Sequence, residues 1–294
     1  MTAVVSVRQK LGPGIGSSQA AAALGLSPWC PPISLWLELT GRQQRQFDSE
    51  KTWLGTVLEP VIRGIYVERH GVEVRVPTSS SYHPEHPWLR DTTDGIVYVP
   101  TSPTEMEPSH VLECKNVGWR LQHHWLVGDE VQVPAYYVCQ AIVHMAVTNL
   151  PRNDFAVLIG GGAYHEAIVH RDMDVEAEVI AGLTEFWHLV ETDTPPEVDG
   201  SNAYTEHLKA KIERAESVVP ATVAAERAAH AWRDCERRMK AIKAERDHFR
   251  NEFLAELVNA KANRMRTEIG IVSVTDNGEG KRTVRRPHHW TGED

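Results

Sequence analysis

Apolar residues between Trp53 and Gly71 recur every three or four positions, which is the spacing of one face of a helix. Gly71 suits the left-handed position at which many helices end. Ala135 to Val147 is almost wholly apolar and predicts a buried helix, whereas Asp174 to Val190 has the pattern of an amphipathic helix. Shorter helices are expected at Gln19 to Leu24 and at Ile33 to Thr40.

Short apolar runs bounded by Gly, Pro and polar residues predict strands between these helices. They are Val72 to Val76, Gly95 to Val99, Val111 to Val117, Phe155 to Gly160 and Tyr164 to Val169. The last two flank a run of glycines, which favours a tight connection between paired strands. Pro100 to Ser109 is rich in Pro and Ser and is expected to be a loop. The pattern predicts a mixed α/β domain over the first 200 residues.

The composition changes after Thr194-Pro195-Pro196. Tyr204 to Ser217 and Ala221 to Asn263 are rich in Ala, Glu, Lys and Arg, and we expect two helices that pair as a helical hairpin. In the longer stretch, apolar residues fall seven apart in two rows that together form a heptad-like stripe. The rows are Cys235, Ile242 and Phe249, and Trp232, Met239 and Phe253, the second broken by Arg246.

The tail contains two strand-like runs, Ile269 to Thr275 and Lys281 to Arg285. They flank Asp276-Asn277-Gly278-Glu279-Gly280, which predicts a β-hairpin. The sequence therefore predicts two domains, residues 1–198 and residues 199–294.

The chain has 294 residues, of which 41% are hydrophobic, and no apolar run reaches the roughly 18 residues that a membrane-spanning helix needs. The start lacks a basic segment followed by an apolar one, so a cytoplasmic protein is expected. A net charge of -9 disfavours a protein that coats DNA, but it is compatible with a nuclease, whose metal site is itself acidic. The four cysteines are scattered, which argues against a zinc knuckle or an iron–sulfur cluster.

Candidate chemistry begins at Glu113-Cys114-Lys115. Residues two apart on a strand point to the same face, so Glu113 and Lys115 would project together while Cys114 points into the core. Alone, such a pair is as well explained by a solvated ion pair. Asp94 opens a strand shortly before, and neighbouring antiparallel strands would let Asp94 and Glu113 share a cation. Carboxylate oxygens favour Mg²⁺ or Mn²⁺, and Lys115 beside the metal could deprotonate or orient a water.

Three further residues extend this hypothesis. Glu59 lies on the expected helix from Trp53 to Gly71 and could add a metal ligand, although a surface glutamate is an equal alternative. Tyr137 and Gln140 lie three apart on the apolar helix and share a face. They could orient the attacking water or the scissile phosphate, or form an ordinary core hydrogen bond.

The motifs follow one order along the chain. They are Gly16-Ser17-Ser18, Gly25-Leu26-Ser27-Pro28-Trp29, Gly55 with Leu58-Glu59-Pro60, Thr93-Asp94-Gly95, Glu113-Cys114-Lys115, and Pro134-Ala135-Tyr136-Tyr137 with Gln140. In this order and spacing they resemble the YqaJ-like viral recombinases, relatives of phage lambda exonuclease in the PD-(D/E)XK nuclease superfamily. The resemblance covers residues 8 to 195. Thr93 stands where the superfamily often has Pro, and residues 200–294 extend beyond the lambda-type core.

The resemblance implies a restriction-endonuclease-like α/β core, with a central mixed β-sheet flanked by helices. It implies 5′-to-3′ digestion of linear double-stranded DNA, which leaves 3′ single-stranded overhangs for phage-type homologous recombination. The metal, Mg²⁺ with Mn²⁺ able to substitute, would be bound by Asp94, Glu113, the backbone carbonyl of Cys114, and Glu59. Lys115 would assist the nucleophile, and Gln140 and Tyr137 would complete the site.

The resemblance also suggests how a DNA end is held. Ser17, Ser18 and Thr93 match positions near the substrate phosphates. The arginine that holds the 5′-phosphate in the lambda enzyme lies just before a Leu-Gly, so either Lys10, which precedes Leu11-Gly12, or Arg8 could be the anchor. A toroidal homotrimer, a single-strand annealing protein as partner, and a phage or prophage protein in the bacterial cytoplasm are implied as well.

Other interpretations remain open. An endonuclease or a single-strand nuclease could use the same core, and a non-catalytic DNA-end-binding protein could carry a relict site. The intact Asp94, Glu113 and Lys115 speak against a relict. Trp29 and Trp119 are candidates for stacking on DNA bases.

Overall fold

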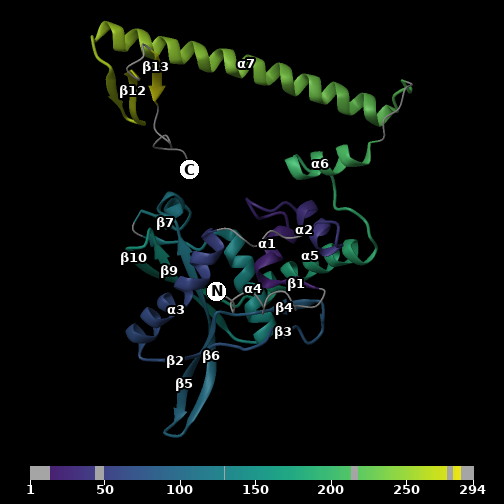
Figure 1. The fold of residues 1–294 in the computed structure, drawn as a ribbon, viewed down its shortest axis with the longest axis vertical. Helices are drawn as coiled ribbons and strands as arrows, with labels where there is room; N and C mark the ends of the chain where they lie inside the picture. The colour runs from purple at the N-terminus through teal and green to yellow at the C-terminus, as the bar shows by residue number, and fades with distance from the viewer. Residues whose placement is uncertain (1–13, 44–49, 129, 213–217, 277–280, 286–294) are drawn as a thin grey trace. The chain divides into compact units, whose positions relative to one another are not determined.

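The computed structural model describes residues 14–43, 50–128, 130–212, 218–276 and 281–285 (Figure 1). The chain divides into two compact units, Met1–Glu213 and Arg214–Asp294. None of the described helices is long and apolar enough to cross a membrane.

A five-stranded mixed sheet with the strand order β10-β9-β6-β5-β2 forms the centre of the first unit. Its strands are β2 (Glu73–Arg75), β5 (Gly95–Ser102), β6 (Glu105–Val117), β9 (Arg152–Ile159) and β10 (Ala163–His170). β6 and β9 are parallel, and the other neighbouring pairs are antiparallel. All the strands expected from the apolar runs are present, and β6 is the middle strand.

Helices cover both faces of this sheet (Figure 1). The helices of the unit are α1 (Ala20–Ala23), α2 (Pro32–Leu39), α3 (Glu50–His70), α4 (Ala135–Thr148), α5 (Met173–Glu191) and α6 (Asn202–Lys211). Tyr66 of α3 packs in a buried cluster with Ala156 of β9. Phe155 and Val157 of β9 belong instead to the larger cluster that contains the apolar side chains of α4. Because successive strand residues point to opposite faces, α3 and α4 cover opposite faces of the sheet.

Smaller elements complete the unit. A second sheet has the order β1-β4-β3, a third pairs β7 with β8, and two short 3₁₀ helices, η2 and η3, precede α1 and β7. Their bounds are β1 (Ile15–Gly16), η2 (Ser17–Gln19), β3 (Ser81–Tyr82), β4 (Leu89–Asp91), η3 (Trp119–His124), β7 (Leu126–Val127) and β8 (Glu130–Val131).

The prediction of a loop from Pro100 to Ser109 is wrong. β5 and β6 continue as a hairpin through most of this segment, with Ser102 opposite Glu105. The register shifts between Val97 and Tyr98 and again between Pro100 and Ser102. Such irregularities accommodate prolines, which cannot donate a hydrogen bond within a regular ladder.

The apolar side chains of α3 also divide differently from the expected stripe. Ile62 and Tyr66 are buried, whereas Trp53, Val57 and Val61, which lie four residues apart along one flank of the stripe, are exposed. The helical spacing was therefore correct, but it did not reveal that only the other flank of the stripe packs fully on the sheet.

The short helix α6 packs within the first unit. Tyr204 is buried, its hydroxyl donates a 2.7 Å hydrogen bond to the carbonyl of Pro196, and the His207 ring meets the Trp36 ring of α2 edge-on. The helical C-terminal extension thus begins with a helix that is part of the core of the first unit.

The described residues of the second unit form one long helix and a small antiparallel sheet with the order β11-β12-β13. Its elements are α7 (Val223–Asn259), β11 (Arg264–Thr267), β12 (Gly270–Asp276) and β13 (Arg282–Arg285). The expected long helix is present, and β12 and β13 form the expected hairpin. The residues of its turn, 277–280, lie outside the described part of the chain.

Candidate active site

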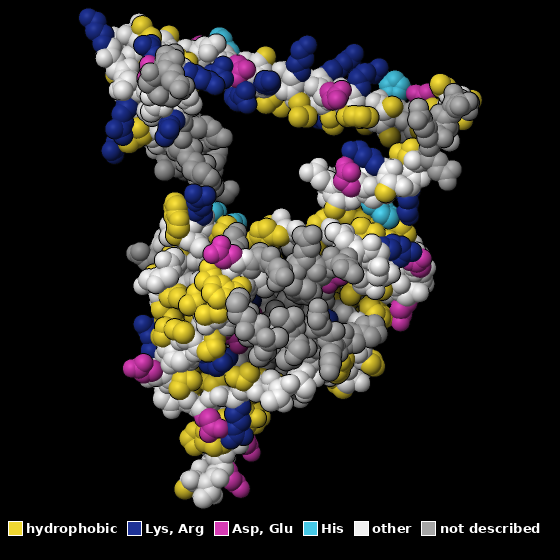
Figure 2. Space-filling view, in the orientation of Figure 1, with side chains coloured by type: hydrophobic (Ala, Val, Ile, Leu, Met, Phe, Trp, Pro, Cys, Tyr) yellow, Lys and Arg dark blue, Asp and Glu magenta, His cyan; other side chains and the backbone are white. Residues whose placement is uncertain are grey.

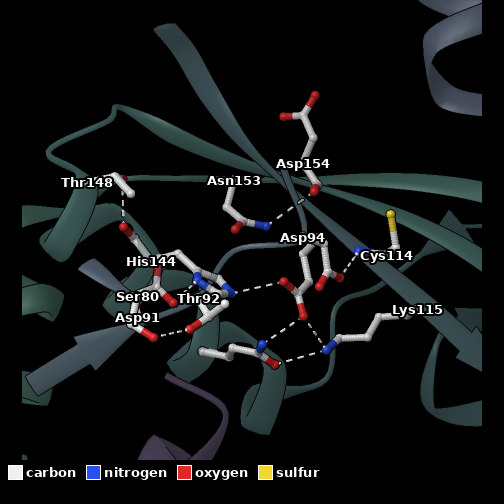
Figure 3. Close-up of polar contacts among 12 residues, drawn as sticks. Ser80, Asp91, Thr92, Asp94, Cys114, Lys115, His144, Thr148, Asn153 and Asp154 are labelled. Atoms are coloured by element: carbon white, nitrogen blue, oxygen red, sulfur yellow. Dashed lines mark hydrogen bonds and ion pairs between the residues drawn. The ribbon is translucent and has the colours of Figure 1, made fainter. Parts of the chain in front are cut away.

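Strand β6 places Glu113 and Lys115 side by side, as the strand period predicts. Lys115 Nζ lies 2.6 Å from Glu113 Oε1, and Gln140 Nε2 of α4 donates a 2.7 Å hydrogen bond to the same oxygen. Lys115 Nζ also donates to Gln140 Oε1 at 3.0 Å, which closes a ring of contacts (Figure 3). Glu113 and Gln140 are buried, so the ring is held away from bulk water.

A buried histidine extends this ring, and sequence reasoning missed it. His144 Nε2 lies 3.1 Å from Glu113 Oε2, and its Nδ1 lies 2.7 Å from Asp91 Oδ1 at the end of β4 (Figure 3). His144 is fully buried and follows Gln140 by one helical turn on the same face of α4. That spacing was the available signal for His144. Asp91 is brought to it only by the packing of β4 against α4.

Asp94 lies between β4 and β5, next to the start of β5. Its Oδ2 accepts a 2.8 Å hydrogen bond from the backbone N–H of Cys114, which fixes the carboxylate beside β6 (Figure 3). A Cβ atom at Gly95 would come within 2.5 Å of the Val74 side chain, so only glycine lets β5 approach β2 here. Asp94 and Glu113 are thus brought together by the pairing of β5 with β6, as expected.

Glu59 lies at the edge of the same site rather than on a remote surface. Arg63, one turn later on α3, donates hydrogen bonds to Glu59 Oε1 at 3.0 Å and to the backbone carbonyl of Asp94 at 2.8 Å. This bridge ties the turn of α3 that carries Glu59 to the segment that carries Asp94.

The charges of the site are strongly coupled. Burial, together with the nearby charges of Glu113 and Glu59, raises the pKa of Asp94 well above its ordinary value. Burial alone would also raise the pKa of Glu113, but Lys115 and His144 outweigh it and lower that pKa to about 2. The site therefore holds Glu113 ionised, while the negative charge at Asp94 lacks a sufficient counter-charge.

The cations of the site are held by the same carboxylates. Burial would lower the pKa of His144, but Asp91 and Glu113 raise it to about 10. Burial would likewise lower the pKa of Lys115, but the charge of Glu113 outweighs it and raises that pKa. Both side chains are therefore positively charged partners of Glu113 near neutral pH.

Comparison with known proteins decides the family. The model of the YqaJ-like viral recombinase domain matches residues 5–151, half of the chain. The chain belongs to the YqaJ-like viral recombinase family. A curated relative, the uncharacterized protein YqaJ of Bacillus subtilis (strain 168), is 28% identical over 208 residues, which cover 69% of this chain. The match covers 62% of the length of that relative.

Solved structures agree on the fold of the YqaJ-like domain. An alkaline exonuclease from Laribacter hongkongensis, LHK-Exo, superposes with a TM-score of 0.50 at 19% identity, covering 68% of this chain and 93% of that chain. The same enzyme in complex with dAMP gives the same values. The first unit is thus the PD-(D/E)XK core that the sequence predicted, with a mixed sheet between helices.

The donor atoms of the YqaJ-like site suit a hard divalent cation. Asp94, Glu113 and Glu59 supply carboxylate oxygens. Burial and the charges of Glu113 and Glu59 raise the pKa of Asp94, and a cation would offset both effects. Within the described ranges, no three His, Cys, Asp or Glu side chains are grouped as a complete metal-binding cluster. Mg²⁺ needs no such cluster, because it commonly takes one or two carboxylates and keeps several waters.

The residues expected near the substrate phosphates differ in how close to the site the structure places them. Thr93 is buried next to Asp94, and its hydroxyl has no hydrogen-bond partner among the described residues. Ser17 and Ser18 follow β1, which pairs with β4, so they lie on a segment next to Asp91. Arg8 and Lys10 lie outside the described residues.

A row of aromatic rings connects the site to the surface. Lys115 Nζ lies 4.4 Å from the centre of the Tyr137 ring, and the Tyr137 and Tyr136 ring centres are 4.6 Å apart. The exposed Trp29 meets Tyr136 edge-on at 4.8 Å. Trp29 thus lies at the outer end of this row, whereas Trp119, also exposed, lies against Gly160.

Proposed function

We propose that this YqaJ-like chain is a Mg²⁺-dependent exonuclease that digests linear double-stranded DNA in the 5′-to-3′ direction. The products would be mononucleotides and a 3′ single-stranded overhang that serves phage-type homologous recombination. Mn²⁺ is expected to substitute for Mg²⁺.

The observation that supports this proposal most strongly is the linked set Asp94, Glu113 and Lys115. The buried Glu113 and the half-buried Asp94, which directly precedes β5, stand beside a lysine of β6, and Gln140 and His144 fix Glu113 from the helix side. An exposed ion pair would have no need of such a buried frame. The family match supports the same chemistry, and LHK-Exo, whose fold this chain shares, is an alkaline exonuclease.

Each residue has a part in the proposed reaction. Asp94, Glu113, the backbone carbonyl of Cys114, and Glu59 would hold the metal, which when bound supplies an activated water and neutralises charge on the phosphate. Lys115 would donate a hydrogen bond to the water or to a phosphate oxygen. Gln140, which is hydrogen-bonded to both Lys115 and Glu113, would hold the two side chains in position. Tyr137 would hold Lys115 over its ring, and the unpaired Thr93 hydroxyl would be free to bind a phosphate oxygen.

The direction of digestion is tested with one linear duplex labelled in turn at the 5′ end and at the 3′ end of the same strand. We expect the 5′ label to be released first, as a mononucleotide, while the 3′ label of the same strand stays in long DNA at early times. Early release of the 3′ label would contradict the proposed direction. No release from either label in Mg²⁺ would favour the non-catalytic end-binding alternative.

The anchor of the DNA end is tested by comparing duplexes with a 5′-phosphate and with a 5′-hydroxyl. We expect faster digestion of phosphorylated ends, and the difference should disappear in either Arg8→Ala or Lys10→Ala, which identifies the anchor. Equal rates on both duplexes in the unmodified protein would show that neither residue holds a 5′-phosphate.

Assembly of the nuclease domain into a toroidal trimer, and recruitment of a single-strand annealing protein, are proposed from the family resemblance. A ring that encloses the duplex would make digestion processive. Degradation of a single labelled duplex in the presence of excess unlabelled competitor, added after the start, is expected to run to completion. Immediate arrest by the competitor would contradict a ring.

A further inference from the structure

One face of α7 carries a row of exposed apolar side chains. Trp232, Met239, Ile242 and Phe249 are 71%, 69%, 63% and 58% exposed. They follow the heptad spacing noted above, and Figure 2 shows hydrophobic side chains in a row along the long helix, with Lys and Arg on much of the rest of its surface. A row with this spacing is the seam of a coiled coil that lacks its partner helix.

The second unit cannot cover this seam with its own described residues. Among the apolar side chains of residues 218–276 and 281–285, only Leu257 and Val272 are buried. A unit with so small a core depends on a partner for much of its stability. α7 has 37 residues, with an apolar seam on one side and polar side chains on the other. Most of the stability of such a helix comes from packing of another element against its apolar seam.

The charges beside the seam identify a second α7 in antiparallel orientation. In an antiparallel pair, residues that flank the seam on the same side meet each other across the interface. With Met239 of one helix packed against Ile242 of the other, Glu236 meets Lys243 and Arg238 meets Glu245. Two-fold symmetry repeats both pairs, so every charged pair of this central segment is attractive.

The seam itself matches in this register. Trp232 packs against Phe249, and Arg246, which interrupts the apolar row, faces the small Cys235. A shift by one heptad in one direction would place Glu245 against Glu245 and Lys243 against Lys243. A shift in the other direction would place Arg238 against Arg238 and Glu236 against Glu236. One antiparallel register therefore avoids like charges.

A parallel pair is disfavoured by the same residues. It would stack Arg246 on Arg246 in the seam and place Arg238 beside Lys243. Like charges at these positions oppose pairing, whereas the antiparallel register has none.

We propose that α7 is a self-association element that pairs with α7 of a second copy of this chain as an antiparallel coiled coil centred between Lys240 and Ala241. This pairing does not depend on the proposed nuclease activity. If the nuclease units also assemble, α7 links those assemblies in pairs.

A substitution in the seam tests the pairing on the full-length protein by light scattering coupled to size exclusion. Met239→Glu is expected to halve the mass of the assembly. Val258→Glu is the matched control, because Val258 is 75% exposed on the same helix but lies outside the seam, and it should leave the mass unchanged. Equal masses for the two variants, or an unmodified protein that stays monomeric, would overturn the proposal.

Disulfide trapping tests the orientation independently of any loss of helix in Met239→Glu. Arg246→Cys should form an interchain disulfide with the native Cys235 of the second copy when oxidised with copper–phenanthroline in air. The crosslink should disappear in Arg246→Cys with Cys235→Ser. In the unmodified protein, a Cys235–Cys235 crosslink would indicate a parallel pair and overturn the antiparallel register. The absence of a bond between Cys235 and the introduced thiol would overturn it as well.

Discussion

Glu113 receives Lys115 and Gln140 on one oxygen and His144 on the other. This arrangement leaves Glu113 ionised in a buried position, where an unpaired carboxylate would be protonated. The three partners come from β6 and from one face of α4, so both elements must be in place before the carboxylate is fixed. The ionised state of Glu113 therefore depends both on the charges of its partners and on the packing of α4 against β6.

Replacement of Glu113 by Gln or of Lys115 by Ala is expected to reduce Mg²⁺-dependent digestion of linear duplex by about a hundredfold or more, since each removes a charge from the proposed metal site. The rate of nucleotide release measures the effect. Glu107→Gln makes the same change at an exposed position of the same strand and should leave the rate intact. Full activity in the Glu113 or Lys115 variant would contradict the assigned roles.

His144 is expected to act as a positioning residue, because it is fully buried and contacts Glu113, a proposed metal ligand. His144→Ala should weaken the apparent affinity for Mg²⁺ by about 10- to 100-fold, as loss of a partner that orients a metal ligand does. A titration of rate against Mg²⁺ should show recovery at high concentration. If His144 served packing alone, thermal stability would fall while the Mg²⁺ dependence of the remaining folded enzyme stayed the same.

Among single residues, the sequence predicted those whose positions follow from local periodicity. Glu113 and Lys115 share a face because a strand repeats every two residues, and Tyr137 and Gln140 share one because a helix repeats every 3.6. Asp91 could not be found in this way, because its contact with His144 joins β4 to α4 across a long stretch of chain. His144 lies in an almost wholly apolar helix, and its two carboxylate partners, Asp91 and Glu113, come from other elements, so the local pattern did not single it out.

Among the elements, α3 is fastened to the sheet by a buried polar cluster that joins Tyr66 to β6 and β9. The Tyr66 hydroxyl donates to Asp154 Oδ2 at 2.7 Å and lies 3.0 Å from His110 Nε2, and Arg152 donates to the same Asp154 oxygen at 3.0 Å. Burial would raise the pKa of Asp154, but the hydrogen bonds from His110 and Tyr66 and the charge of Arg152 outweigh it and lower that pKa.

Because the folded-state pKa of Asp154 lies below its unfolded value of about 3.9, this group stabilises the fold above that pH and less so as the pH falls below it. Asp154→Asn should lower the free energy of unfolding by about 1–3 kcal/mol at pH 7, and the difference should shrink as the pH falls from about 4. Urea titrations at several pH values measure it. Glu178→Gln on the exposed side of α5 is the control, and a pH-independent difference for Asp154→Asn would contradict this role of the carboxylate.

Helices and strands whose apolar spacing is continuous were predicted well, whereas strands interrupted by proline were not. α3, α4, β9 and β10 follow directly from their apolar spacing. The extension of β5 and β6 was hidden by Pro100 and Pro108, which are typical of loops but here sit in an irregular hairpin. The exposure of Trp53, Val57 and Val61 depends on which flank of α3 faces the sheet, and no local pattern contains that information.

For the whole molecule, the end of the YqaJ-like domain is expected after α6 rather than near residue 198. A chain truncated after Glu213 should keep the thermal stability of this domain, because Tyr204 remains buried. Truncation after Val198 removes Tyr204, which corresponds to a loss of about 3–5 kcal/mol for a large buried aromatic side chain. Equal melting temperatures for the two truncated chains would contradict this boundary.

The composition change after Pro196 indicated a second part of the chain but could not show that α6 returns to the first unit. Its burial rests on Trp36 of α2 and on the carbonyl of Pro196, which are tertiary contacts. The heptad rows of α7, in contrast, were visible in the sequence, because a seam is a periodic feature of one helix.

The proposed activity of the whole protein is digestion of DNA from its ends by the site around Asp94, Glu113 and Lys115. The most direct measurement is a time course of nucleotide release from end-labelled linear duplex and from uniformly labelled closed circular duplex of the same sequence, with and without Mg²⁺. We expect loss of the linear duplex only when Mg²⁺ is present, with the circle intact throughout. Cleavage of the circle, or digestion of the linear duplex in the presence of a chelator, would contradict this activity.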